Sequence, residues 1–242
     1  MSEKSPKFHR VLLKISGEAL AGPAGFGIDP ETLGDIAAQI VEVHQLGVQT
    51  AVVVGGGNII RGGIFSAKGQ IDRTSADQMG MMGTVINALA LQSAIERLGP
   101  AVRVQSAISV NQVCESFIKR RAVRHLEKGR VVVFAAGTGN PFFSTDTASA
   151  LRALEIEANL LIKATNVDGI YDKDPRKNPD AVRYDKVGYG EVIQKRLAVM
   201  DQTAFTLCRE NGLSIIVLDL NEPHAIAKAV MGETIGTLVE GE

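Results

Sequence analysis

Glycines, hydroxyl side chains and positive charges gather in four short segments, each directly after an apolar run rich in β-branched residues. These segments are 14–17, 55–63, 137–146 and 163–169. Glycine lets backbone N–H groups approach an anion closely, and the start of a helix adds partial positive charge. Lys14, Arg61 and Lys163 would supply the full charges that phosphate groups require. One such turn could simply reverse the chain, but three glycine-rich turns with two strand-end lysines favour a phosphate site.

The two common glycine motifs for nucleotides are absent from the sequence. A P-loop requires G-x-x-x-x-G-K-[ST], yet no Gly-Lys dipeptide occurs in the chain. The G-x-G patterns that start at Gly25, Gly55, Gly137 and Gly188 all lack the third glycine of the dinucleotide-binding fingerprint. Hydride transfer therefore has little support, and a phosphate would be held by a different arrangement.

Strand-like apolar runs alternate with helical patterns along the chain. The expected strands are 10–15, 48–54, 101–106, 130–136, 159–164, 214–218 and 237–239. The expected helices are 33–46, 75–98, 119–128, 145–157, 202–211 and 223–231, the first after a helix start at Asp29, Pro30 and Glu31. This alternation predicts an α/β fold, a three-layer α/β/α sandwich with a largely parallel central sheet. Ligands of such sheets bind beyond the carboxyl ends of the strands, where the glycine-rich segments lie.

Composition narrows the class of protein further. The 242 residues carry a formal net charge of −1, which argues against a nucleic-acid binder, and the basic run 119–124 is expected to be an exposed helix face. Cys114 and Cys208 stand apart from any CxxC or histidine pair, so neither a disulfide framework nor a zinc cluster is expected. The polar start and the short apolar runs predict no signal peptide, no membrane span and a cytoplasmic location. No composition break marks a second domain, so 8–240 should form a single domain after a flexible tail, 1–7.

Four motifs together resemble the amino-acid-kinase superfamily: KISGEAL at 14–20, GGGN at 55–58, GTGNPFF at 137–143 and TNVDG at 165–169. Within it the chain is similar to the bacterial uridylate kinases, in register from about residue 8 to 240. The TGNPFF segment is the most specific motif, because relatives that phosphorylate carboxylates lack it, and GFGID at 25–29 is a second such element. The resemblance implies an amino-acid-kinase-like fold and reversible transfer of the γ-phosphoryl group of ATP to UMP, in the synthesis of UTP and CTP. It also implies Mg²⁺ with ATP, a homohexamer, activation by GTP and inhibition by UTP.

The resemblance also implies roles by position. Residues for ATP would be Lys14, Ile15, Ser16, Gly17, Gly57, Arg61, Lys163, Thr165, Asn166, Tyr171 and Asp174. Residues for UMP would be Gly56, Asp77, Thr138, Gly139, Asn140, Pro141, Phe142, Phe143, Ser144 and Thr145. The region linked to GTP would be Gly22, Pro23, Ala24, Gly25, Phe26 and Gly27. No direct metal ligand is identified.

Several of these residues also have a plain structural interpretation. The segment 167–175, with Tyr171, could be a surface turn, although its place after a strand ending near Lys163 favours nucleotide binding. Asp77 could merely complement a helix dipole, and only the family likeness favours a ribose contact. The catalytic set would be Lys14, Arg61, Asp146 and Asp201. The two carboxylates in this set would orient the lysines or a hydrated metal, or else only begin helices.

The expected chemistry needs no general base. A phosphate monoester has a second pKa of about 6, so the acceptor is already ionised at pH 7. The four histidines, His9, His44, His125 and His224, lie outside the glycine-rich segments and are expected on the surface or in helices. Two other functions remain open: a carboxylate or carbamate kinase of the same superfamily, and a non-catalytic nucleotide-binding storage or sensor protein. Segment 140–143 argues against the first, and the presence of Lys14 argues against the second.

Overall fold

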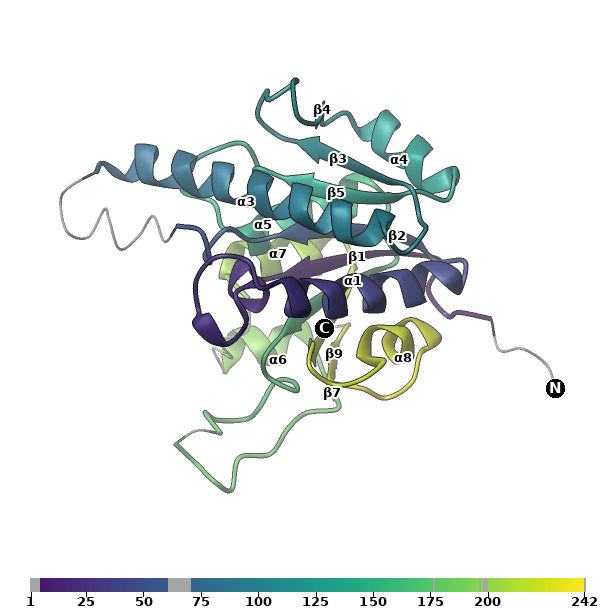
Figure 1. The fold of residues 1–242 in the computed structure, drawn as a ribbon. Helices are drawn as coiled ribbons and strands as arrows, with labels where there is room; N and C mark the ends of the chain where they lie inside the picture. The colour runs from purple at the N-terminus through teal and green to yellow at the C-terminus, as the bar shows by residue number, and fades with distance from the viewer. Residues whose placement is uncertain (1–4, 61–70, 176, 196, 198–199, 242) are drawn as a thin grey trace.

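The computed structural model describes residues 5–60, 71–175, 177–195, 197 and 200–241, and these build one nine-stranded sheet (Figure 1). Its strands are β1 (Arg10–Ile15), β2 (Gln49–Val54), β3 (Val102–Ser106), β4 (Glu115–Ser116), β5 (Val131–Ala135), β6 (Leu160–Thr165), β7 (Lys186–Val187), β8 (Ser214–Asp219) and β9 (Thr237–Val239). They lie in the order β4-β3-β5-β2-β1-β6-β8-β9-β7, so β1 occupies the middle of the sheet. Among these described strands, every pairing is parallel except that of β8 with β9. The prediction of a largely parallel sheet is confirmed.

Helices cover both faces of the sheet, as Figure 1 shows. One layer holds α1 (Pro30–Gln45), α3 (Arg73–Glu96) and α8 (Ala225–Met231), and the other holds α4 (Lys119–Glu127), α5 (Thr145–Glu155), α6 (Tyr189–Gln194) and α7 (Gln202–Glu210). Side chains of β1 alternate between the layers: Val11, Leu13 and Ile15 pack with the first, whereas Leu12 packs with the second. Because both faces of the strand are covered, its apolar run is continuous. The predicted three-layer α/β/α sandwich is confirmed.

Polar side chains cap the longer helices. Asp29 accepts a hydrogen bond from Thr32 N at 2.8 Å and caps α1, at the helix start that its sequence predicts. Asp72, Ser144 and Asp201 cap α3, α5 and α7 in the same way. The last two of these caps join the starts of α5 and α7, because Ser144 donates a hydrogen bond to Asp201.

Some elements differ from the sequence prediction. The two-residue strands β4 and β7, the six-residue helix α6 and the 3₁₀ turns η1 (Gly17–Leu20) and η2 (Gly22–Ala24) are too short for a period to emerge in the sequence. Helix α3 begins at Arg73, before the expected 75, because Asp72 caps it. Helix α8 begins at Ala225, after the expected 223, because His224 has a left-handed backbone with φ of 62°. No helix in the described part of the chain is long and apolar enough to cross a membrane.

Candidate active site

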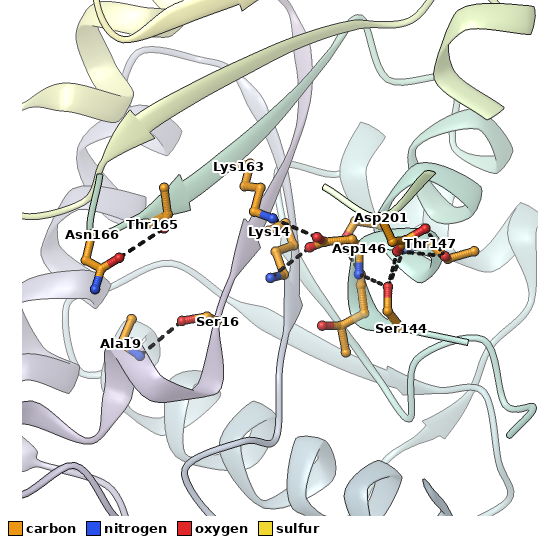
Figure 2. Close-up of polar contacts among 12 residues, drawn as sticks. Lys14, Ser16, Ala19, Ser144, Asp146, Thr147, Lys163, Thr165, Asn166 and Asp201 are labelled. Carbon is orange, nitrogen blue, oxygen red and sulfur yellow. Dashed lines mark hydrogen bonds and ion pairs between the residues drawn. The ribbon is translucent and has the colours of Figure 1, made fainter. Parts of the chain in front are cut away.

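Two lysines meet one carboxylate at the carboxyl end of the central strands. Lys14 on β1 and Lys163 on β6 are register partners on neighbouring strands. Their Nζ atoms lie 2.8 Å and 2.6 Å from the two carboxylate oxygens of Asp146, in the first turn of α5 (Figure 2). The side chains of Lys14, Lys163 and Asp146 are only 9%, 13% and 13% exposed. Asp146 therefore holds both ammonium groups in place.

Burial and charge act in opposite directions on this cluster. Burial alone would raise the pKa of the Asp146 carboxyl, but the ammonium groups of Lys14 and Lys163 outweigh it and hold that pKa below its usual range. Burial lowers the pKa of Lys163, and the attraction of Asp146 offsets this only in part because Lys14 adds repulsion. Asp146 is therefore a carboxylate at neutral pH. A bound phosphate would favour the charged form of Lys163.

A second carboxylate, Asp201, fixes the start of α5. Ser144 accepts hydrogen bonds from Asp146 N at 3.0 Å and Thr147 N at 3.1 Å, and its hydroxyl donates to Asp201. Thr147 Oγ1 lies 3.0 Å from the same carboxylate, which also accepts from Ala204 N at 2.9 Å as the cap of α7 (Figure 2). Asp201 thus begins one helix and braces the start of another. Its hydrogen bonds place it one step behind the lysines, through the turn that carries Asp146, and its charge also attracts Lys163.

The turns after β1 and β2 touch each other through backbone atoms. A Cβ added to Gly17 would lie 2.5 Å from Asn58 Oδ1 and 2.7 Å from Gly57 N, and one added to Gly55 would lie 2.7 Å from Gly17 N. Such distances are shorter than real Cβ contacts, so glycine is required at both positions for packing. Segments 16–17 and 55–57 consequently form one continuous glycine-lined surface beside Lys14.

A cleft of about 920 Å³ opens beside the lysine pair. Predicted ATP residues that line it are Lys14, Ser16, Lys163, Thr165 and Asn166, and Gly22 and Pro23 of the predicted GTP region also line it. Helix α1 and the segment after β8 complete its wall, with Glu42, Asn221 and His224 among the lining residues. The cleft is large enough for a nucleotide and has both ammonium groups on its wall.

Several predicted ATP residues lie outside the lining of this cleft. The Tyr171 hydroxyl donates a hydrogen bond to Asp168 at 2.8 Å, and the backbone of Tyr171 forms an isolated antiparallel β-bridge with Arg183. Asp174 lies in the same loop after β6. Ile15 is buried in the core, so its contribution is packing and backbone position. The predicted role of Tyr171 and Asp174 at adenosine stays a prediction. Arg61 lies outside the described residues.

A smaller pocket of about 230 Å³ lies on the other side of the lysine cluster, and six of its fourteen lining residues were predicted for UMP. The predicted residues in it are Gly56, Asp77, Thr138, Asn140, Phe143 and Thr145, joined by Gly57 from the ATP set. Asp77 accepts hydrogen bonds from Phe142 N and from Arg73 Nε, each at 2.8 Å. Ser144 is the cap of α5, and Phe142 has a left-handed backbone with φ of 73°. Gly139 and Pro141 belong to the same loop, although they do not line the pocket.

Of the residues of α3 that line this pocket, the sequence predicted Asp77 alone. The α3 residues Ala76, Gly80, Met81 and Thr84 line the pocket beside Asp77. Thr84 Oγ1 accepts a hydrogen bond from Ala136 N at 2.6 Å and so holds the backbone where β5 ends. Positions 77, 80 and 84 recur at three and four residues, which is the spacing of a single helix face. That spacing is the signal that could have identified them.

The fold and the site define a class. A parallel sheet with no P-loop presents two lysines, a shared carboxylate and touching glycine turns between two cavities, an arrangement suited to phosphate esters. Comparison with known proteins agrees: the model of the amino acid kinase family matches residues 9–219. Uridylate kinases of Xanthomonas oryzae pv. oryzae and Xanthomonas euvesicatoria pv. vesicatoria are each 56% identical over 241 residues, 100% of this chain and 99% of theirs.

Solved structures give the same result. UMP kinase from Bacillus anthracis superposes with a TM-score of 0.94 at 39% identity, covering 96% of each chain. UMP kinase from Ureaplasma parvum superposes with a TM-score of 0.90 at 37% identity, covering 96% of this chain and 98% of that one. The chain belongs to the amino acid kinase family and, within it, to the uridylate kinases.

Proposed function

We propose that this chain reversibly transfers the γ-phosphoryl group of ATP to UMP, giving ADP and UDP, as a step in pyrimidine nucleotide biosynthesis. The observation that carries the proposal is the pair of cavities around the lysine cluster. Lys14 and Lys163 line the larger cleft, whereas Thr145, the chain neighbour of Asp146, lines the smaller pocket. Two nucleotides bound there would bring their phosphates together at this cluster. The full-length similarity to uridylate kinases supports the identity of the acceptor.

ATP would occupy the larger cleft and UMP the smaller pocket. The phosphates of ATP would lie against Lys14, Lys163 and the backbone of the glycine turns, where N–H groups and ammonium groups can share the charge. The ribose of UMP would lie at Asp77, whose carboxylate accepts hydrogen bonds, and its base beside Asn140 and Phe143. Asp77 already accepts from a backbone N–H and a guanidinium, so it is held ready as an acceptor.

The residues would act by position and charge, without a proton-transferring side chain. The UMP phosphate is ionised at neutral pH, so it can attack directly. Lys14 would stabilise the charge that develops on the transferring group, and Asp146 would keep Lys14 and Lys163 at a fixed separation. Among the described histidines, His224 lines the larger cleft, where its Nδ1 lies 2.7 Å from Glu42 Oε1, and none lines the smaller pocket.

Phosphoryl transfer of this kind uses a divalent metal, which we propose to be Mg²⁺ bound with ATP. Within the described part of the chain, no group of three or more histidine, cysteine or acidic side chains is placed to hold a metal ion. Both oxygens of Asp146 face lysines. The phosphate oxygens of ATP would therefore hold the ion, which supplies charge neutralisation when bound, and Asp146 could reach it only through water.

Regulation by GTP and UTP and assembly as a homohexamer complete the proposal. Loop 22–27 supports the first part, because Gly22 and Pro23 line the larger cleft while Phe26 is 72% exposed. Met79, Met82 and Ile86 support the second part, because they recur on an exposed face of α3 at the spacing of a helical contact surface.

A coupled assay of ADP formation tests the function. Purified protein with Mg²⁺ and ATP would be given UMP, CMP, dTMP, N-acetylglutamate or carbamate in parallel. We expect turnover with UMP to exceed turnover with the other acceptors. Turnover on N-acetylglutamate or carbamate without turnover on UMP would assign the chain to a carboxylate or carbamate kinase. Binding of ATP without ADP formation on any acceptor would instead indicate a nucleotide-binding sensor or storage protein.

A further inference from the structure

Two buried side-chain amides pair with each other beneath the glycine turn after β2. Asn58 follows the turn and is 1% exposed, and Asn87 lies on α3 and is 0% exposed. Asn58 Nδ2 donates to Asn87 Oδ1 at 3.0 Å, and Asn87 Nδ2 donates to Asn58 Oδ1 at 2.6 Å. This reciprocal pair links two segments that are far apart in the chain. Core packing does not explain either residue, because burying a side-chain amide costs free energy unless its donors and acceptors are hydrogen-bonded.

Each amide of the pair also holds a backbone carbonyl. Asn87 Nδ2 donates to Gly55 O at 2.7 Å, at the start of the glycine turn. Asn58 Nδ2 donates to Gly27 O at 2.6 Å, and Gly27 N returns a hydrogen bond to Asn58 O at 2.9 Å. Gly55 and Asn58 bracket Gly56 and Gly57, so both ends of the turn are tied to the pair. The end of loop 22–27 is tied to it as well.

The neighbouring turn lies close against the Asn58 amide. The position of a Cβ on Gly17 would be 2.5 Å from Asn58 Oδ1, so the amide is enclosed by the backbone of the neighbouring turn. A second main-chain bond, Asp29 N to Leu20 O at 2.8 Å, closes loop 22–27 at its base. Hydrogen bonds therefore hold the loop at its base and at Gly27. The bonds at Gly27 involve Asn58, a member of the amide pair, whereas the bond at the base does not.

We propose that Asn87 is a positioning residue. Through Asn58 it fixes the backbone of Gly56 and Gly57 at the phosphate site, and it joins loop 22–27 to that backbone so that loop and turn move together. Asn87 itself lines neither cavity, so it acts only through the turn. The kinetic consequence rests on the proposed phosphoryl transfer, whereas the mechanical link rests on the hydrogen bonds alone.

The test compares Asn87→Ala, Asn58→Ala and the double variant with Leu91→Ala as a matched control. Leu91 lies one helical turn from Asn87, is equally buried and packs only in the apolar core. We expect kcat/KM with UMP and ATP to fall about tenfold or more in each asparagine variant, as for the loss of one buried hydrogen bond. The double variant should lose less than the product of the two single losses, because either change already breaks the pair. Leu91→Ala should lose thermal stability and keep kcat and both KM values.

Amide hydrogen exchange supplies a readout that does not depend on any nucleotide. In Asn87→Ala, exchange should rise in residues 55–60 and also in loop 22–27, which Asn87 does not touch. Leu91→Ala, measured at a temperature where both variants are folded, should show neither change. If the alanine variant does not fold, Asn87→Ser takes its place, because its hydroxyl is polar but too short to reach both partners.

Two results would overturn the inference. One is exchange in loop 22–27 that is the same in Asn87→Ala and Leu91→Ala. The other is a loss of activity in the asparagine variants that matches their unfolded fraction. A wild-type protein that makes no UDP would contradict the proposed function but not the mechanical link. The exchange comparison tests that link without any nucleotide.

Discussion

The side chains of Lys14, Asp146 and Lys163 form a largely buried cluster of charges. Opposite charges within 3 Å attract strongly where water is scarce, yet removing them from water has a cost of similar size. Two ammonium groups share one carboxylate in this cluster, and Asp201 attracts Lys163 as well. Both lysines also line the larger cleft, where a phosphate can pair with their charges.

The first prediction at the residue scale concerns Lys14. Lys14→Ala should lower kcat by about 10²–10³-fold, as for the removal of one donor to a transition state. The fold should persist, because Asp146 keeps its ion pair with Lys163. A coupled ADP assay measures the effect. Lys228→Ala, which removes an exposed lysine paired with Glu222, is the control and should behave as wild type. Near-wild-type kcat in Lys14→Ala would remove Lys14 from the mechanism.

Asp146 should make stability depend on pH in acid. Its pKa is depressed in the folded protein, so its contribution is fully present above the ordinary carboxyl pKa of about 3.9 and is lost as the pH falls through the folded value. The gap in unfolding free energy between wild type and Asp146→Asn should therefore be largest near neutral pH and shrink below about pH 4. Urea denaturation at a series of pH values measures it.

The control for this experiment is Asp180→Asn, which removes an exposed ion pair with Lys173. Exposed pairs contribute little, so this variant should follow wild type throughout the pH series. A gap between wild type and Asp146→Asn that stays constant from neutral to acid pH would contradict the assigned ion pairs.

Asp77 should distinguish the two substrates. Asp77→Asn should raise KM for UMP about tenfold or more, because a charged hydrogen bond contributes about 1.5–3 kcal/mol, and should leave KM for ATP nearly unchanged. Titration of each nucleotide separately measures this. Asp72→Asn on the same helix is the control, since asparagine caps helices as well as aspartate does. An equal loss for both nucleotides would refute the ribose contact.

At the scale of elements, helix α3 organises the acceptor side. One of its faces carries Asp77, Gly80, Thr84 and Asn87, at spacings of three and four residues. Gly56 lets the turn after β2 approach this helix, since a Cβ on Gly56 would lie 2.6 Å from Gly80 O. The same helix thus contacts the pocket, the turn after β2 and the end of β5, which sets the distance between them.

Thr84 provides a test of this organising role. Thr84→Val keeps the side-chain shape but leaves the buried Ala136 N–H without its acceptor, at a backbone position with φ of 61°. We expect a loss of about 1–3 kcal/mol in unfolding free energy and a several-fold rise in KM for UMP alone. Thr50→Val, a buried change in β2 away from both pockets, is the control. If KM for UMP is unchanged when stability falls, the hydroxyl is only structural.

The sequence predicted those elements whose signal is local. Residues 11–13 form a continuous apolar run because both faces of β1 are covered, and Asp29 caps α1 with its own neighbours. Strand β4 escaped prediction because its two residues gain their conformation only by pairing with β3. The ion pairs of Asp146 likewise depend on three strand and helix ends meeting in space. Asn87 shares the helical spacing of Thr84, but its role could not be predicted locally, because its partners lie in the turn after β2, about 30 positions earlier in the chain.

At the scale of the whole molecule, the two cavities are built by different parts of the chain. The smaller pocket is lined by residues between 56 and 145, on the side of β2 and β5. The larger cleft is lined by residues 14–42 and 163–224, on the side of β6 and β8. Strand β1 lies between these sides and carries Lys14 at its end. Substitutions on either side should therefore affect mainly one substrate.

The response to GTP is a prediction at this scale. Phe26→Ala should blunt activation by GTP and leave unstimulated turnover nearly unchanged, because the exposed ring is available to a neighbouring subunit and touches no substrate pocket. Coupling between sites typically amounts to about 1–3 kcal/mol, so GTP should change wild-type kinetics several-fold. Leu98→Ala, another exposed apolar change, is the control. Full activation of Phe26→Ala would show that the loop is only a connection.

The central place of β1 has a consequence for how the chain is made. One edge of β1 pairs with β2 soon after both are synthesised, but its other edge pairs with β6, and the bond from Arg10 N to Asn159 Oδ1 spans 149 positions. At about 5–20 residues per second, a ribosome leaves that edge without its partner for roughly 7–30 s. During this time an apolar strand presents unpaired N–H and C=O groups, which other chains can pair with. The strand that carries Lys14 is therefore also the point where an unfinished chain is most exposed to aggregation.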